Sequence, residues 1–309
     1  MNILMFTSAE AKSTFPVATV LLVVLAILGL AFAVVFVKDL MDHKDKLEKD
    51  TSFIVTFIIG AVANFFDTLG IGSFAPTTSA LRFTKQTEDR LIPGTLNVAC
   101  CIPVIAEAFL FIKAVDVSPV TLVGMIVAAT VGSYIGAGIV SKLPTQKVQL
   151  VMGVALFVTG VIFALQLAKL FPSGDEQSLV VGLTGIQLII AIAVNFLLGA
   201  LMTAGIGLYA PCMALVYLLG MNPKVAFPIM MGSCAYLMPV ASIKFVKEGA
   251  YNRVASLMIT IGGVIGVLVA FFIVKNMPLG VLKVLVTVVI FYTSVTLFLS
   301  ATRKKEGNK

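Results

Sequence analysis

The stretch Asp67-Thr-Leu-Gly-Ile-Gly-Ser-Phe-Ala-Pro76 lies within one long apolar segment, and the similar stretch Thr203-Ala-Gly-Ile-Gly-Leu-Tyr-Ala-Pro211 lies within another. Glycine is unfavourable inside a helix, and proline lacks the backbone N–H that a helix interior needs. Each segment is therefore predicted to break near mid-length. Because proline is favoured at the first position of a helix, a new half-helix is predicted to start around Pro76 and around Pro211.

The composition is that of a membrane protein. Of the 309 residues, 59% are hydrophobic and only 12% are charged, and the mean hydropathy is +1.07. A soluble domain carries about 25% charged residues. Apolar blocks of about 20 residues match the thickness of the hydrocarbon core. We predict an all-α polytopic membrane protein with about nine hydrophobic segments, at about 16–40, 53–83, 94–113, 118–141, 146–171, 179–220, 224–247, 252–274 and 278–300.

An internal repeat relates the two glycine-containing stretches. Gly70 to Pro76 matches Gly205 to Pro211 at an offset of 135 residues, and Phe111-Ile-Lys113 matches Phe245-Val-Lys247 at an offset of 134. The predicted organisation is therefore an N-terminal transmembrane helix with a charged loop, then two homologous repeats, then a basic cytoplasmic tail. Their boundaries are 1–52, 53–171, 179–302 and 303–309.

The Lys and Arg residues indicate how the repeats are oriented. If each broken segment crosses once, 13 of these residues lie inside and 8 outside, with Lys283 left aside within a segment. If each contributes an even number of crossings, 16 lie inside and 5 outside, which fits the positive-inside rule better. The five outside are Lys12, Lys113, Lys169, Lys224 and Lys275. The halves are then inverted, with the C-terminus in the cytoplasm.

Segment length separates a re-entrant hairpin from two full crossings. Segment 53–83 would be about 46 Å long as a helix, too short to cross a core of about 30 Å twice. It is therefore predicted to be a re-entrant hairpin with its tip near 67–72. Segment 179–220 has room for a full helix and a shorter limb, so both parities stay open there.

The breaks are the predicted binding site. Non-helical backbone at membrane depth needs protein or a water-filled cavity to satisfy it, so the four glycines of the two motifs are predicted to face a cavity. Two half-helix N-termini that converge there would bind a small anion. A single hydroxyl near a break can bond to its own helix instead, but the cluster beside the glycines favours binding. The predicted substrate-binding residues are Thr68, Gly70, Gly72, Ser73, Thr77, Asn97, Thr203, Gly205, Gly207, Tyr209, Cys212 and Cys234.

Two carboxylic residues fall within apolar segments, where such residues are costly and usually functional. Asp67 could carry a proton, could bind Na⁺ together with Asn64 and Asn97, or could only cap a helix. Glu107 could be a second proton site, could pair with Lys244, or could lie near an interface. Asn64, Asp67 and Glu107 are the predicted coupling residues. An ionised Asp67 in an anion site would repel the substrate, which favours co-transport.

Other functional classes find no support in the sequence. The cysteines have no metal-ligand spacing, no cofactor motif is present, and no nucleophile is paired with a base, so an enzyme is not expected. The net charge of +7 comes from short loops and the tail, which favours lipid headgroups over nucleic acid. The expected partners are a small anionic substrate, H⁺ or Na⁺, and the lipid bilayer.

The duplicated Gly-Ile-Gly-x-aromatic-Ala-Pro motifs, the Pro93-Gly-Thr-Leu96 stretch and the Phe-x-Lys ends resemble the TauE/SafE family of membrane transporters over about residues 53–300. Ser73-Phe74 and Leu208-Tyr209 stand where the family motif is richer in glycine. The resemblance implies secondary transport of sulfite, sulfoacetate or a related organosulfonate across the cell membrane. An uncoupled anion channel and a transporter of a small carboxylate are the alternatives.

Overall fold

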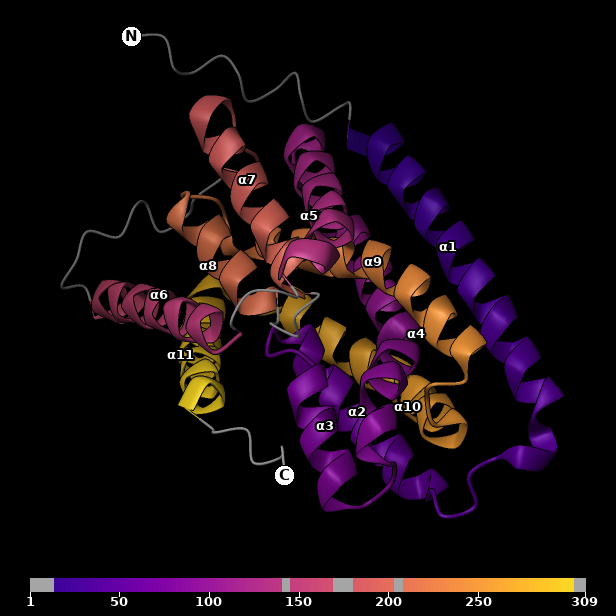
Figure 1. The fold of residues 1–309 in the computed structure, drawn as a ribbon. Coiled ribbons are helices and arrows are strands. Elements are labelled where there is room, and N and C mark those ends of the chain that lie inside the picture. Colours follow the sequence, from indigo (N-terminus) through magenta and orange to yellow (C-terminus); the bar gives the residue numbers. More distant parts are fainter. Residues whose placement is uncertain (1–13, 141–144, 169–179, 203–207, 303–309) are drawn as a thin grey trace, which may run out of the picture.

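The computed structural model describes residues 14–140, 145–168, 180–202 and 208–302. These residues form helices and no strand, as the predicted all-α class requires (Figure 1). The α-helices in chain order are α1 (Thr14–Asp42), α2 (Phe53–Thr68), α3 (Phe74–Phe83), α4 (Ile92–Ala114), α5 (Pro119–Val140), α6 (Thr145–Leu167), α7 (Gly185–Met202), α8 (Tyr209–Leu218), α9 (Ala226–Glu248), α10 (Arg253–Lys275) and α11 (Leu279–Thr302).

Both predicted breaks are present. The chain leaves α2 at Thr68 and starts α3 at Phe74, and Gly70 and Gly72 adopt φ values of +94° and +90° between them. Only glycine adopts such angles at low cost, which explains both residues. The second break separates α7 from α8. Each new half-helix starts two residues before its proline, at Phe74 and Tyr209, so the prolines lie within the first turn instead of opening it.

Each broken segment starts and ends at the same end of the molecule. Before α2, the Ser52 backbone N–H donates to Oε1 of Gln86, which follows α3, at 2.6 Å. Near the start of the second segment, the Val180 carbonyl accepts from the Asn222 N–H, beyond α8, at 2.9 Å. Both segments are therefore hairpins. The length of the second segment allowed either an odd or an even number of crossings, and the structure gives it the same form as the first.

The two hairpins enter from opposite ends. The Asn252 side chain, just before α10, donates to the hydroxyl of Thr51 at 2.9 Å, which joins the end of α9 to the first hairpin. The Leu183 N–H, just before α7, donates to Oγ1 of Thr121 on α5 at 2.9 Å, which joins the end of α4 to the second hairpin. Since α4 has 23 residues, the two ends are about 35 Å apart. The repeats are therefore inverted.

The first helix of each repeat packs against the fourth helix of the other repeat. Helices α2 to α6 match α7 to α11 in order, and α2 packs along α10 just as α7 packs along α5 (Figure 1). A Cβ on Gly266 would lie 2.1 Å from the Ala61 carbonyl oxygen, and a Cβ on Gly132 would lie 2.0 Å from that of Phe196. Gly132 and Gly266 occupy the same position of the repeat, where the helix backbones touch.

Helix α1 lies outside the repeats, along α9 and α4 (Figure 1). Its end is held by Asp39, which accepts from Nε of Arg253 at 2.7 Å and from the Tyr251 hydroxyl at 2.6 Å. Near its start, the Leu21 carbonyl accepts from the hydroxyl of Tyr236 on α9 at 2.7 Å. Helix α1 is therefore anchored to the second repeat at two depths.

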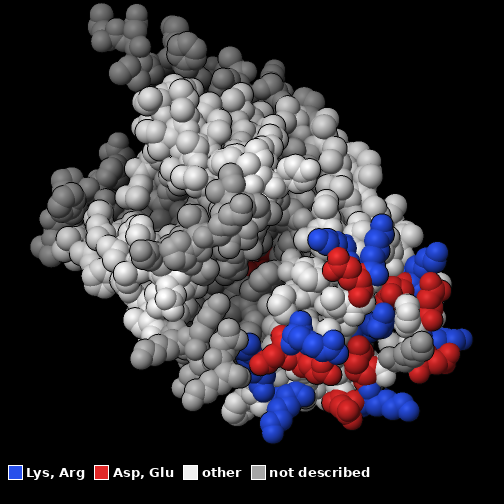
Figure 2. Space-filling view, in the orientation of Figure 1, with Lys and Arg blue, Asp and Glu red and all other residues white. Residues whose placement is uncertain are grey.

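The surface is that of a membrane protein. Six helices in the described ranges are long and apolar enough to cross a bilayer: Val17–Asp42, Asp89–Ala114, Gly185–Met202, Pro223–Glu248, Arg253–Lys275 and Gly280–Thr302. On the face shown in Figure 2, charged side chains gather at the end where α1 finishes, and the rest of that face is nearly free of them. The predicted polytopic membrane fold is confirmed.

Candidate functional site

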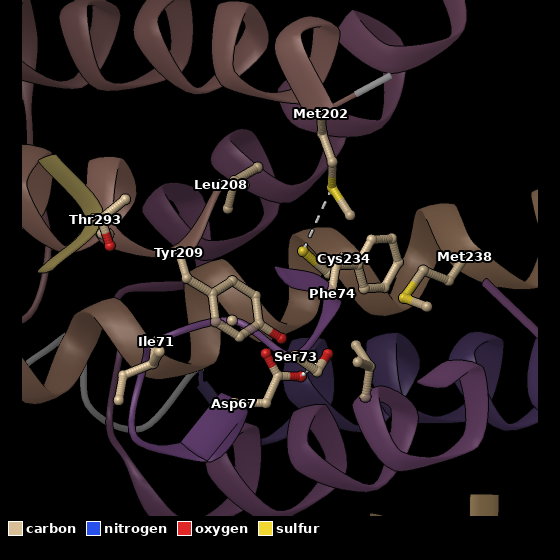
Figure 3. A pocket seen from close by; sticks show the side chains of 13 residues that line it. Asp67, Ile71, Ser73, Phe74, Met202, Leu208, Tyr209, Cys234, Met238 and Thr293 are labelled. Atoms are coloured by element: carbon tan, nitrogen blue, oxygen red, sulfur yellow. Dashed lines mark hydrogen bonds between the residues drawn. The ribbon is translucent and has the colours of Figure 1, made fainter. Parts of the chain in front are cut away.

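A cavity lies where the two hairpin tips meet (Figure 3). Its empty space, with the open mouth included, is about 590 Å³. Both breaks, α4, α9 and α11 contribute to its lining, which consists of Asp67, Ile71, Gly72, Ser73, Phe74, Val104, Met202, Leu208, Tyr209, Ala210, Cys234, Met238 and Thr293. No Lys or Arg is among these described lining residues, so the positive potential that the described elements can supply is that of the half-helix N-termini.

Asp67 lies in front of the N-terminus of α3. It belongs to the last turn of α2 and is 2% exposed. The Ser73 hydroxyl donates to its Oδ2 at 3.0 Å, and the Ser73 backbone amide faces the same carboxyl group. Ser73 is the residue that precedes α3, so its amide belongs to the positive end of that half-helix.

Glu107 connects the two breaks. It is fully buried in the middle of α4. The Thr68 hydroxyl, at the end of α2, donates to its Oε1 at 2.8 Å, and the Tyr209 hydroxyl, at the start of α8, donates to its Oε2 at 3.1 Å. One carboxyl group of the first repeat therefore bonds to both hairpin tips.

The opposite wall of the cavity is apolar and rich in sulfur. Met202, at the end of α7, lies 3.6 Å from Cys234 of α9, measured between sulfur atoms. Met238 lies one turn beyond Cys234, and Leu208 precedes α8. In Figure 3 these side chains lie across from the oxygen atoms of Asp67, Ser73 and Tyr209. The site thus has a polar side and an apolar side.

Five of the predicted site residues line the cavity: Asp67, Gly72, Ser73, Tyr209 and Cys234. Thr68 and Glu107 do not line it, and hydrogen bonds through Glu107 join them to the lining residue Tyr209. Gly70 is packed against Met213, whose sulfur would lie 2.6 Å from an added Cβ. Thr77 is fully buried, and its hydroxyl has no hydrogen-bond partner within the described part of the chain.

Other predicted residues lie elsewhere. Asn97 donates to the Pro93 carbonyl of its own helix at 2.9 Å and does not line the cavity. Cys212 is buried within α8 outside the lining. Lys244 is exposed and lies 4.0 Å from Glu248, so it does not pair with Glu107. Thr203, Gly205 and Gly207 lie outside the described residues.

The Asn64 side chain remains a candidate for cation binding. Its Nδ2 donates to the Gly60 carbonyl at 2.9 Å, while its Oδ1 is buried without a protein partner in the described ranges. An unpaired carbonyl oxygen one turn before Asp67 fits the oxygen ligands that alkali cations take.

Sequence reasoning missed most of the apolar wall, although the repeat contains its signal. Met202 corresponds to Asp67 and Leu208 to Ser73 at the offset of 135, and Met238 corresponds to Val104 at 134. The cavity therefore lies between equivalent positions of the two halves. Extending the motif match to every position would have identified these residues.

Inverted hairpins whose tips meet at one cavity define a class of protein, the membrane transporters with broken helices at a midplane site. The model of the family "Sulfite exporter TauE/SafE" matches residues 4–163. The chain belongs to this family. The match includes α1, whereas the resemblance based on the motifs began only at about residue 53. Neither the search of curated proteins nor the search of solved structures gave a match.

Proposed function

We propose that this protein is a secondary transporter of a small sulfur-containing anion, such as sulfite, sulfoacetate or a related organosulfonate. The observation that carries the proposal is the cavity between the two hairpin tips, where Ser73 and Tyr209 precede or open half-helices and no basic side chain lines the described wall. Half-helix N-termini and hydroxyl donors hold an oxyanion without the cost of burying a cation. The family description supports a sulfur anion.

The polar and apolar sides of the cavity support both inorganic and organic substrates. An oxyanion head fits beside Ser73 and Tyr209, and the short apolar part of an organosulfonate fits against Met202, Leu208 and Met238. Movement of one repeat against the other would expose the site to each side in turn. The proposed setting is the cell membrane, with the charged end and the C-terminus in the cytoplasm.

We propose coupling to H⁺ or Na⁺ through Asp67, Glu107 and Asn64. Two carboxyl groups lie at the breaks with no described Lys or Arg among the lining residues. Two ionised carboxylates and an anion so close together would repel one another strongly. Uptake of a cation with the anion removes this repulsion, whereas an uncoupled channel has no need of the carboxyl groups.

The test is uptake into proteoliposomes. Sulfite, thiosulfate, sulfoacetate, taurine and small carboxylates are offered with an inward H⁺ gradient, an inward Na⁺ gradient or no gradient. We expect uptake of a sulfur anion above that of protein-free liposomes, driven by one of the gradients. Uptake of carboxylates alone would overturn the sulfur assignment. Flux that ignores both gradients and the Asp67→Asn substitution would indicate the channel.

A further inference from the structure

The anion-binding end of α3 already holds an anionic group of the chain. Asp67 accepts from the Ser73 hydroxyl at 3.0 Å and faces the Ser73 backbone amide at the start of the half-helix. These are the donors that an oxyanion takes at a helix N-terminus. We infer that Asp67 is an internal competitor for the transported anion, which occupies this position only after Asp67 has bound a proton and released Ser73. This inference rests on the proposed function.

The groups around Asp67 leave protonation as the simplest way to admit an anion. The titratable side chains that face it are Glu107 and Cys100 of α4, Tyr209 of α8 and Cys234 of α9. None of them carries a positive charge. An arriving anion would therefore meet an ionised Asp67 with no side-chain cation to offset it. A proton on Asp67 removes both the repulsion and the competition for the Ser73 donors.

Among the described residues, the competition for a half-helix N-terminus is confined to the first repeat. Met202 occupies the position that corresponds to Asp67, and it has neither a charge nor an acceptor of comparable strength. Glu107 accepts from the Tyr209 hydroxyl at 3.1 Å, but in the described part of the chain it makes no bond to a backbone amide of α8, so it does not occupy that helix N-terminus. Asp67 is thus the residue that makes anion binding conditional on a proton, and one proton enters the site with each anion.

The experiment is calorimetric titration of the full-length protein in detergent with methanesulfonate, which stays a monoanion between pH 5 and pH 8. Titrations in two buffers with different heats of ionisation give the number of protons taken up. For the wild type, at a pH where Asp67 is ionised before the anion binds, we expect about one proton per anion and a Kd that rises about tenfold per pH unit. Asp67→Asn should take up none and should keep its pH 5 affinity at pH 8.

Glu88→Gln is the matched control, because Glu88 is an exposed carboxylate beyond α3. It should behave as the wild type does. Wild-type binding at pH 8 without proton uptake, binding that requires Na⁺ instead, or loss of binding in Asp67→Asn at pH 5 would each overturn the inference and leave the proposed function standing. The wild-type proton count decides the matter even if Asp67→Asn does not fold. Absence of binding by methanesulfonate, sulfite and sulfoacetate to folded wild type would instead reject the proposed function.

Discussion

Tyr209 donates the hydrogen bond that ties the second hairpin to Glu107. In Tyr209→Phe this carboxyl group keeps only the Thr68 donor and stays buried. Removing one partner of a buried polar group costs about 1–3 kcal/mol, so the free energy of unfolding should fall by that amount. Reversible unfolding in mixed detergent measures it. The double variant Tyr209→Phe/Glu107→Gln should lose less free energy of unfolding than the sum of the two single losses, because both substitutions weaken the same bond.

Tyr134→Phe is the control for this prediction, since Tyr134 is 87% exposed on α5. It should leave the free energy of unfolding unchanged within about 0.5 kcal/mol. Strict additivity of Tyr209→Phe and Glu107→Gln would show that the bridge does not couple the two hairpins.

At the scale of residues, the sequence predicted the side-chain types of the site better than the position of each residue along its helix. Asp67, Ser73 and Tyr209 flank the glycine motifs, and all three line the cavity. Asn97 was predicted with them because of its amide side chain. It lies seven residues before the lining residue Val104 on α4, which places it about 10 Å from Val104 toward the charged end. Partners such as Glu107 and Tyr209, 102 residues apart, come together only through the fold, which no local pattern encodes.

At the scale of elements, the close contacts of α10 with α2 and of α5 with α7 depend on glycine. A Cβ on Gly266 would lie 2.1 Å from the Ala61 carbonyl oxygen, and the backbone cannot yield as a side chain would. Gly266→Ala should therefore lower the free energy of unfolding by about 1–3 kcal/mol, as overpacking does. Gly132→Ala should do the same for α5 and α7. Gly280→Ala, with nothing within 4 Å, should be neutral, and equal effects at all three positions would contradict the packing argument.

A second prediction at this scale concerns the attachment of α1. Asp39 and Arg253 have side chains that are each 13% exposed, and Tyr251 donates to the same carboxylate. Asp39→Asn should lower the free energy of unfolding by about 1.5–3 kcal/mol, the range for hydrogen bonds to charged groups. Asp42→Asn, an exposed position one turn on, is its control and should have no effect. An equal loss in both variants would assign the effect to general charge.

The helices themselves were predictable because each apolar block is bounded by polar or glycine-rich residues. Segments such as 94–113 and 252–274 differ from α4 and α10 by only one or two residues at either end. The breaks followed from glycine and proline chemistry. The number of crossings of segment 179–220 could not be predicted in this way, because its length allowed an odd or an even number. The hydrogen bond from Asn222 to Val180 decides between them, and it joins residues far apart in the sequence.

At the scale of the whole molecule, inverted hairpins and the charge distribution together predict sidedness. The end of α1, the loop before α2 and the end of α9 lie at the charged end (Figure 2), and the hydrogen bonds place the end of α4 at the other end of the molecule. The positive-inside rule predicts that the charged end faces the cytoplasm. This agrees with the 16 to 5 division of Lys and Arg that an even number of crossings requires.

Cysteine labelling tests that orientation. The four native cysteines are buried, so the background with a membrane-impermeant maleimide should be low. Lys44→Cys and Lys247→Cys, both exposed, should react in inside-out vesicles and not in intact cells. Lys113→Cys, at the far end of α4, should show the opposite pattern, because α4 and α9 run antiparallel. Reaction of Lys113→Cys and Lys247→Cys from the same side would contradict the inverted arrangement, whereas reversal of all three would keep the fold and invert its placement in the membrane.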